Sequence, residues 1–423
     1  MSKEITTPQI AGILGGFAVI GLIIGRTMKV LLKDDASPPE LTNGQDEQNN
    51  DTPPPPPPPE FSLTDYSLDN DFAFSIFLDV ARTREGNLGF SPYSADNALS
   101  SVALGAQGVT QEEITNALNL TTQSEERIKE TRLLFQEHLE EVSPSGEVLS
   151  SNALLLPKGS VLNSDYRDLS TSYFSTLIRV IPEMGEEVNQ WAQDTTNNNI
   201  TQIVNNGPIS ALIESYLLST FVFTLPWDHN SYQQKLQTQN FSSPDEDIET
   251  EFVLLKGELF YGASEEATIV TLDHDDDNFS AHIIIPEDET DDFYHNFDYD
   301  LFYDLKTKRI TETAVLHLPV INFQETLQLE NPLRNRNINK VFNPSVADLY
   351  KMVDFYEDDE RNPYIGVFLQ KTKVQIPTPT EENTFHIEDN TPTIKADKPF
   401  LIILEEKATN SILFLGRVVN PEK

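Results

Sequence analysis

Histidines are the side chains whose spacing would first reveal acid–base or metal chemistry in this sequence. No His-Glu-x-x-His pair, no Gly-x-Ser-x-Gly segment and no glycine-rich loop ending in Gly-Lys occurs in the chain. The seven histidines stand singly, at His138, His229, His274, His282, His295, His317 and His386. We therefore expect no enzymatic activity and no nucleotide cofactor.

Aspartates gather in one short stretch, where Asp273 is followed by three more at residues 275–277. Such a group could collect a cation, but the turn glycine of an EF-hand loop is missing. We expect a solvated hairpin tip there. The chain has no cysteine, which excludes thiolate zinc sites, disulfides and a cysteine nucleophile. No metal or other cofactor is expected.

Acidic residues dominate the charge of the chain. There are 68 Asp and Glu against 29 Lys and Arg, a formal net charge of -39. Such a charge repels phosphate backbones, so nucleic acid is not an expected partner. The acids are typical of a solubilising surface, and a basic protein partner stays open.

An apolar run near the N-terminus predicts a membrane anchor. Residues 10–25 (IAGILGGFAVIGLIIG) form 16 uninterrupted apolar residues, and flanking lysine and arginine stems could extend the span. The alternative, a secretory signal, has a weak basic start and no small-x-small cleavage site. We expect residues 1–33 to be a tail with a single-pass anchor. The flanking charges do not decide whether the large domain is extracellular or cytoplasmic.

A polar linker follows at residues 34–60. It ends in seven prolines, residues 53–59, which form neither helix nor central strand and favour a stiff polyproline II spacer. A ligand for a proline-recognising domain is the alternative interpretation. The rest of the chain, residues 61–423, is predicted to be one domain.

Helical and strand patterns alternate in that domain. Apolar spacing predicts a helix over residues 72–81, a short strand ending at Pro92 and a helix over residues 96–104. Thr110 and Glu113 have the spacing of a capping box for the next helix. Strands are expected at residues 153–156, 216–225, 283–285, 315–318 and 399–404. Helices early and antiparallel-looking strands late indicate an α+β architecture.

Several segments, in one order, resemble the serpin family over nearly all of residues 61–423. They are NLGFSPYS at 87–94, ALGAQGVTQEEITNAL at 103–118, VNQWAQDTTNNNITQIV at 188–204, LLKGELFY at 254–261, IIIPE at 283–287, residues 318–349 and KADKPFLIILEEKATNSILFLGRVVNPEK at 395–423. The resemblance implies the serpin fold, with a large antiparallel or mixed main sheet, smaller sheets and an exposed reactive loop. It also implies that Trp191 and Trp227 occupy packed family positions, so both are expected to be shielded.

Serpins inhibit serine proteases by offering the reactive loop as bait and inserting the cleaved loop into the main sheet. The loop of this chain departs from the family pattern. Measured from the hinge to residues 398–400, it is about six residues shorter than in typical inhibitory members. The hinge carries Thr378, Thr380, Glu381, Glu382, Asn383 and Thr384, where the family has glycine, threonine and alanines.

Two registers of the loop are open, and both disfavour insertion. In one register Glu381 and Asn383 would be buried; in the other Pro377 and Pro379 would delete ladder hydrogen bonds. Ser219, where the family usually has asparagine, and Leu225, where it often has glycine, also put the opening of the main sheet in doubt.

The resemblance places the bait bond near Glu388–Asp389, which would suit an acid-specific protease. Two functions stay open. One is a non-inhibitory serpin, a binding or scaffolding module held at a membrane, whose partner is another protein. The other is a suicide-type peptidase inhibitor with an acidic bait bond.

Overall fold

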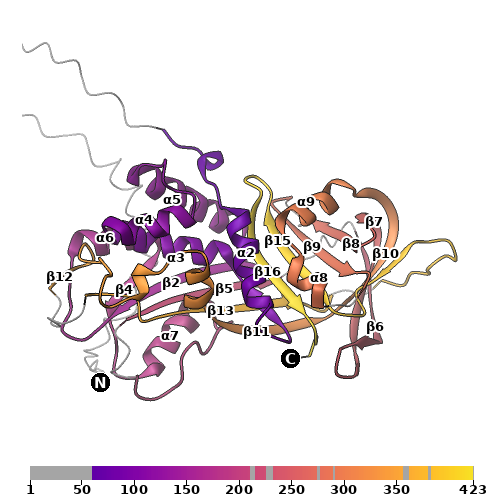
Figure 1. The fold of residues 1–423 in the computed structure, drawn as a ribbon. Helices are drawn as coiled ribbons and strands as arrows, with labels where there is room; N and C mark the ends of the chain where they lie inside the picture. Colours follow the sequence, from indigo (N-terminus) through magenta and orange to yellow (C-terminus); the bar gives the residue numbers. More distant parts are fainter. Residues whose placement is uncertain are drawn as a thin grey trace, which may run out of the picture. The chain divides into compact units, whose positions relative to one another are not determined.

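Strands of two large sheets and a group of helices at one end make up the folded part of the chain (Figure 1). The structure is a computed structural model. It describes residues 60–422 except 210–214, 225–231, 274–276, 289–290, 356–361 and 380–382. The predicted anchor at residues 10–25 and the linker up to residue 59 therefore lie outside the described residues.

The helices of the described residues lie mostly in the first half of the domain. They are η1 Leu63–Asp65, α2 Asn70–Ala81, α3 Pro92–Gly105, α4 Gly108–Ala117, α5 Glu125–Val142, α6 Ser164–Phe174, α7 Gly185–Thr195, α8 Asp291–Asn296, α9 Tyr299–Thr307, α10 Glu330–Asn335 and η2 Lys340–Phe342.

The strands of the described residues are concentrated in the second half. They are β1 Leu88–Phe90, β2 Val148–Leu156, β3 Val161–Leu162, β4 Thr176–Val180, β5 Tyr216–Thr224, β6 Gln233–Ser242, β7 Asp247–Ala263, β8 Ala267–Asp273, β9 Phe279–Pro286, β10 Ile310–Pro319, β11 Ile321–Gln328, β12 Val353–Phe355, β13 Val367–Ile376, β14 Thr393–Lys395, β15 Phe400–Glu406 and β16 Ser411–Val418.

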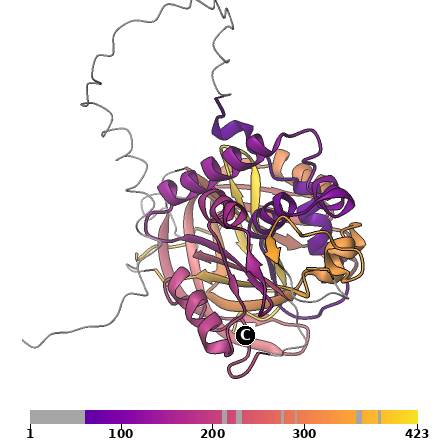
Figure 2. The same cartoon turned by 90° about the vertical axis from the view of Figure 1, so that its left-hand side faces the viewer.

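The five-stranded sheet, which we call the main sheet, has the order β11-β13-β5-β2-β4. Its central strands β13 and β5 run parallel, whereas β11 and β13 are antiparallel. Helix α3 packs on one face of this sheet and α7 on the other (Figure 2). The nine-stranded sheet has the order β1-β16-β15-β9-β8-β7-β10-β14, with β6 beside β7.

Local sequence explains where the early helices begin. Asp69 caps α2 by accepting a hydrogen bond from the backbone N–H of Phe72 at 2.9 Å, and the apolar residues of α2 are buried. Ser91 caps α3 in the same way, and Pro92 occupies the first turn, where its missing N–H costs nothing. The predicted helices at residues 72–81 and 96–104 are confirmed.

The predicted capping box is wrong. Helix α4 begins at Gly108, so Thr110 lies inside its first turn. The Thr110 hydroxyl instead accepts a hydrogen bond from the N–H of Asp348 at 3.1 Å. Glu113 accepts from the N–H groups of Asn339 and Lys340, each at 2.7 Å. The two side chains connect α4 to a segment more than 200 residues away, a use that local spacing does not reveal.

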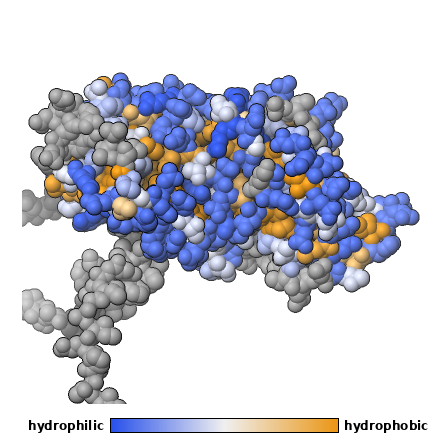
Figure 3. All heavy atoms as spheres, turned by 90° about the horizontal axis from the view of Figure 1, so that it is seen from below, coloured by the Kyte–Doolittle hydropathy of each residue, from blue (hydrophilic) through white to orange (hydrophobic). Residues whose placement is uncertain are grey.

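The five apolar runs predicted as strands lie in β2, β5, β9, β10 and β15, within the described residues. The expected antiparallel pairing is complemented by three parallel pairs, β13 with β5, β2 with β4 and β10 with β14. The sheets are therefore mixed. Figure 3 shows mainly hydrophilic residues on the face seen from below, as the acidic composition predicts.

Trp191 is less shielded than the resemblance implied. Its side chain is half-buried on α7, where it packs against a core cluster with Leu149 and lines a small cavity beside Leu155 and Leu218. The shielding expected for Trp191 is therefore partial, because α7 covers the sheet from outside. Trp227 lies outside the described residues.

Candidate functional site: the loop between β13 and β14

A loop of residues 377–392 connects the two large sheets. It begins after Ile376, the last residue of β13 in the main sheet, and ends before Thr393, the first residue of β14 in the other sheet. The chain between β13 and β15 projects beyond the strands at the right-hand end of the molecule (Figure 1). Strand β14 anchors the far end by parallel pairing of Thr393 with Val315 of β10.

The predicted hinge residues lie at the start of this loop. Thr378, Asn383 and Thr384 are exposed, whereas residues 380–382 are outside the described part of the chain. Asn383 makes two hydrogen bonds with the backbone of Gln234 in β6. Its N–H donates to the Gln234 carbonyl at 2.6 Å, and its side-chain oxygen accepts from the Gln234 N–H at 2.8 Å. The hinge is therefore attached to an edge of the nine-stranded sheet.

The predicted bait residues lie in an exposed turn. Glu388 and Asp389 are both exposed. The N–H of Thr391 donates to the carbonyl of Glu388 at 3.0 Å, so the chain reverses over Asp389 and Asn390. The carbonyl of Pro392 then accepts from the N–H of Val315 at 2.9 Å. This turn presents the Glu388–Asp389 bond at the surface.

Residues between the hinge and the bait alternate in exposure. Phe385 and Ile387 are half-buried against the core, while Thr384, His386 and Glu388 are exposed. A period of two is the pattern of a strand with one covered face. His386 therefore lies on the open side of this segment.

Among the described residues, no part of the loop is inserted between the strands of the main sheet. Strands β5 and β13 pair directly over nine residues, from Val367 opposite Tyr216 to Gln375 opposite Thr224. An inserting loop would have to break this parallel ladder and form antiparallel ladders on both sides.

A buried polar cluster joins these two strands to α3. Gln370 of β13 accepts from the N–H of Ser91 and donates to its carbonyl, both at 2.8 Å. On β5, the Ser219 hydroxyl hydrogen-bonds with that of Ser94. All four side chains are buried. Ser219, singled out from the sequence, thus belongs to the contact that holds the central strands; Leu225 is outside the described residues.

A second buried cluster has the residue types of a catalytic triad, and sequence spacing gave no sign of it. The Thr271 hydroxyl lies 2.9 Å from His282 Nδ1, and His282 Nε2 lies 2.9 Å from Glu405. Lys306 also contacts Glu405, at 2.6 Å. Burial alone would raise the pKa of Glu405, but the contacts with His282 and Lys306 outweigh it and bring the pKa to about 2.

That cluster cannot meet a substrate. Thr271 is 1% exposed and His282 is fully buried, and the guanidinium of Arg309 donates to the Thr271 hydroxyl. Burial lowers the pKa of His282 despite the neighbouring carboxylate. The residues connect β8, β9, β15 and α9 and act as structural partners.

The described residues contain neither a cluster of metal ligands nor a helix able to cross a membrane. Among the described residues, no three histidine, aspartate or glutamate side chains converge as metal ligands. Asp273 and Asp277 each contact Lys407, while the aspartates between them are not described. No described helix combines the length and apolar character needed to cross a bilayer.

Comparisons with known proteins agree with this geometry. The family model "Serpin (serine protease inhibitor)" matches residues 67–421. A serpin-like protein of Methanosarcina acetivorans is 24% identical, covering 84% of this chain and 85% of the relative. Serpin B10 of Sorex araneus is also 24% identical, covering 83% and 98%. The solved structure of native protease nexin-1 with heparin aligns with a TM-score of 0.72 at 16% identity, covering 85% and 98%.

Proposed function

Because this chain belongs to the serpin family, we propose that it is a membrane-tethered, non-inhibitory serpin. Proteases cut its reactive loop as they cut an ordinary substrate. The family model that matches the chain is described as a serine protease inhibitor. The observation that carries the proposal is the loop: it is short, it is attached at Asn383, and its residues do not suit the main sheet.

The register of an inserted loop follows from β13. Its buried residues are even-numbered, from Phe368 to Ile376. If the turn between β13 and the inserted strand had an even number of residues, the buried face would carry Glu381, Asn383, Phe385 and Ile387. A turn with an odd number would bury Glu382, Thr384, His386 and Glu388 instead. Only the first register buries apolar side chains, and it also buries Glu381.

Two costs oppose that register. Burial of Glu381 without a partner costs on the order of several kcal/mol. The loop is also short. Residues 381–388 in extended form span roughly 26 Å at ~3.3 Å per residue, against roughly 30 Å for the nine-residue ladder of β5 and β13 that they must replace. The two central strands would be left partly unpaired.

Incubation with a panel of serine and cysteine proteases tests this proposal. We expect loop cleavage without any complex that survives SDS. A stable covalent complex with one protease would contradict the non-inhibitory role.

The alternation of Phe385 and Ile387 favours a second candidate function, a suicide-type inhibitor with an acidic bait bond at Glu388–Asp389. These apolar side chains would fill the buried face of an inserted strand. An acid-specific protease is the partner that this function requires, and the same panel separates the two candidates if it includes a glutamate-specific and an aspartate-specific protease.

The membrane part of the proposal rests on the apolar run at residues 10–25, followed by the proline-rich linker at residues 34–60. Full-length protein should resist carbonate extraction from membranes, and a chain that begins at Glu60 should be soluble. Release of the full-length protein by carbonate would contradict the anchor.

A further inference from the structure

The loop is not a free tether, because Asn383 and Phe385 dock on β6 and β7. Asn383 is the first, through its paired hydrogen bonds with the Gln234 backbone. This arrangement repeats one unit of an antiparallel ladder, with the side-chain oxygen of Asn383 in place of a backbone carbonyl. It fixes the position of the chain at the edge of the nine-stranded sheet.

Phe385 is the second docked residue. Its ring lies 4.7 Å from Lys235 Nζ and 5.9 Å from Lys256 Nζ, measured to the ring centroid. Lys235 lies opposite Leu254 in the β6–β7 ladder, and Lys256 is two residues further along β7, so both lysines share one face. Both ammonium groups lie within about 6 Å of the ring centroid, the range in which cation–π attraction is favourable.

Lys256 also binds the loop backbone. Its Nζ donates to the carbonyl of His386 at 2.8 Å, which holds the His386–Ile387 peptide against β7. Ile387 and Phe385 are both partly buried against the core cluster that includes Leu254. The segment 383–387 is thus held by hydrogen bonds, cation–π contacts and apolar burial together.

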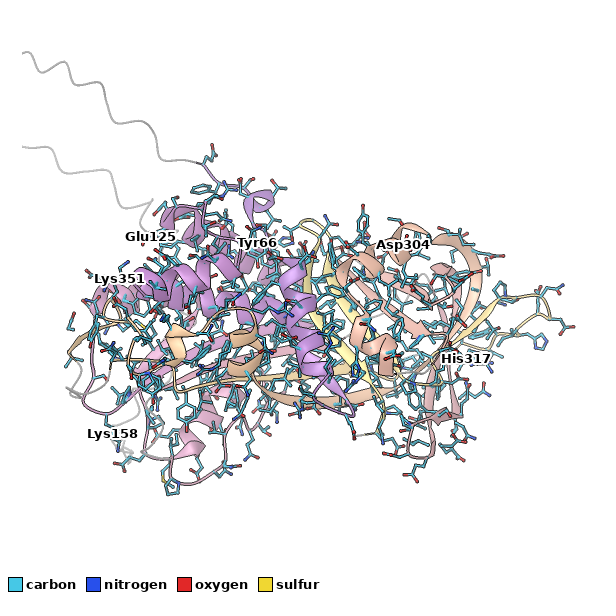
Figure 4. The ribbon with its side chains drawn as sticks, viewed as in Figure 1. Tyr66, Glu125, Lys158, Asp304, His317 and Lys351 are labelled. Carbon is cyan, nitrogen blue, oxygen red and sulfur yellow. The ribbon has the colours of Figure 1, made fainter. Side chains whose placement is uncertain are left out.

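Charge supports the docking. Lysines are scarce in a chain with a formal net charge of -39, yet Lys235 and Lys395 lie in one row across β6, β7, β10 and β14, with Leu254 and His317 between them. His317 is labelled at the base of the projecting segment in Figure 4. The loop carries Glu388 and Asp389, whose negative charges attract this basic group and favour the docked position.

We propose that Asn383, Phe385, Lys235 and Lys256 form a latch that determines where proteases can cut the loop. The latch shields the peptide bonds of residues 383–387, because a protease needs an extended, undocked segment in its active site. The turn at residues 388–392 remains accessible. The latch adds to the proposed function. It rests on that function in one respect only, namely that the loop is the segment which proteases cut.

The test maps cleavage sites in the full-length protein by mass spectrometry. A chymotrypsin-type protease reports on the bond after Phe385, and a glutamate-specific protease reports on the bond after Glu388. We expect fast cleavage after Glu388 in the wild-type protein. Cleavage after Phe385 should be slow compared with the same bond in a free peptide of residues 377–395.

Variants then remove the latch. The double variant Lys235→Ala with Lys256→Ala, and separately Asn383→Ala, should raise the rate of cleavage after Phe385 by about tenfold, since access requires opening of the docked segment. The rate after Glu388 should stay within about twofold in the same variants, because that bond is already exposed.

Lys158→Ala is the matched control. Lys158 is an exposed lysine at the opposite end of the molecule (Figure 4), and its loss should change neither rate. If the lysine double variant does not fold, Asn383→Ala decides the outcome, because it alters only the exposed loop. Equal rates after Phe385 in the protein and the free peptide, or unchanged rates in the variants, would overturn the latch. Neither result depends on whether a covalent protease complex forms.

Discussion

Gln370 of β13 lies opposite Ser219 of β5 in a parallel ladder, and both side chains are buried. Each contacts the first turn of α3, Gln370 through Ser91 and Ser219 through Ser94. The two central strands of the main sheet are therefore joined to the N-terminal end of the same helix by buried polar contacts. Separation of the strands would leave buried polar groups without partners.

Gln370→Ala should lower the free energy of unfolding by about 1–3 kcal/mol, because the N–H and carbonyl of Ser91 would lose their buried partner. Urea denaturation measures this change. Gln324→Ala, which removes an exposed glutamine on β11, serves as the control and should stay within about 0.5 kcal/mol of wild type. Equal losses in the two variants would show that Gln370 has no special part in the strand contact.

A buried ion pair joins α3 to α5. Arg132 donates to both carboxylate oxygens of Asp96 at 3.0 Å, and both side chains are at most 2% exposed. Asp96→Asn should destabilise the protein by about 3–5 kcal/mol, because it leaves a buried guanidinium charge without its counter-ion. Asp96→Leu combined with Arg132→Met should recover most of that loss. Failure of the double variant to recover stability would mean that the pair contributes more than mutual neutralisation.

Half-burial of Trp191 predicts an intermediate response to quenchers. The chain has two tryptophans, so Trp227→Phe leaves Trp191 as the only one. Iodide should quench its fluorescence more than that of a core tryptophan and less than that of the unfolded protein. Trp191→Ala should cost less than the roughly 3–5 kcal/mol typical of a fully buried aromatic. Complete protection from iodide would contradict the position of α7.

The pKa of His317 makes stability depend on pH. Burial, with help from Lys395 and Lys235, lowers this pKa to about 4, below the unfolded value of about 6.5. Between these values the unfolded state binds more protons, so the free energy of unfolding rises with pH across this window. The contribution of neutral His317 to the free energy of unfolding is present in full above about pH 6.5 and decreases as the pH falls to about 4.

Chemical denaturation of His317→Gln at several pH values checks this dependence. The variant should show a shallower rise in stability between about pH 4 and 6.5 than the wild type. His386→Gln, which replaces an exposed loop histidine, should retain the wild-type slope. Identical slopes in the wild type and His317→Gln would contradict the assignment.

Sequence patterns predicted the elements whose apolar spacing is local, such as α2 and the strand β9. The family resemblance predicted the fold, since its motifs are spread over the whole domain. The contacts of Phe385 with Lys235 and Lys256 could not be predicted, because these partners lie about 130 or more residues away and no local period marks them. For the same reason, the spacing of Thr110 and Glu113 predicts a local cap, whereas their actual partners are distant in the sequence.

Cleavage after Glu388 followed by a thermal melt tests the central claim most directly. A loop that enters the main sheet adds a strand and raises the melting temperature steeply, whereas a loop that stays outside leaves the packing of β5 and β13 unchanged. We predict that the melting temperature of the nicked protein stays within about 3 °C of the intact protein, a change of roughly 2 kcal/mol or less. A rise well beyond that range after a single cut would contradict the account and identify the protein as an inserting serpin.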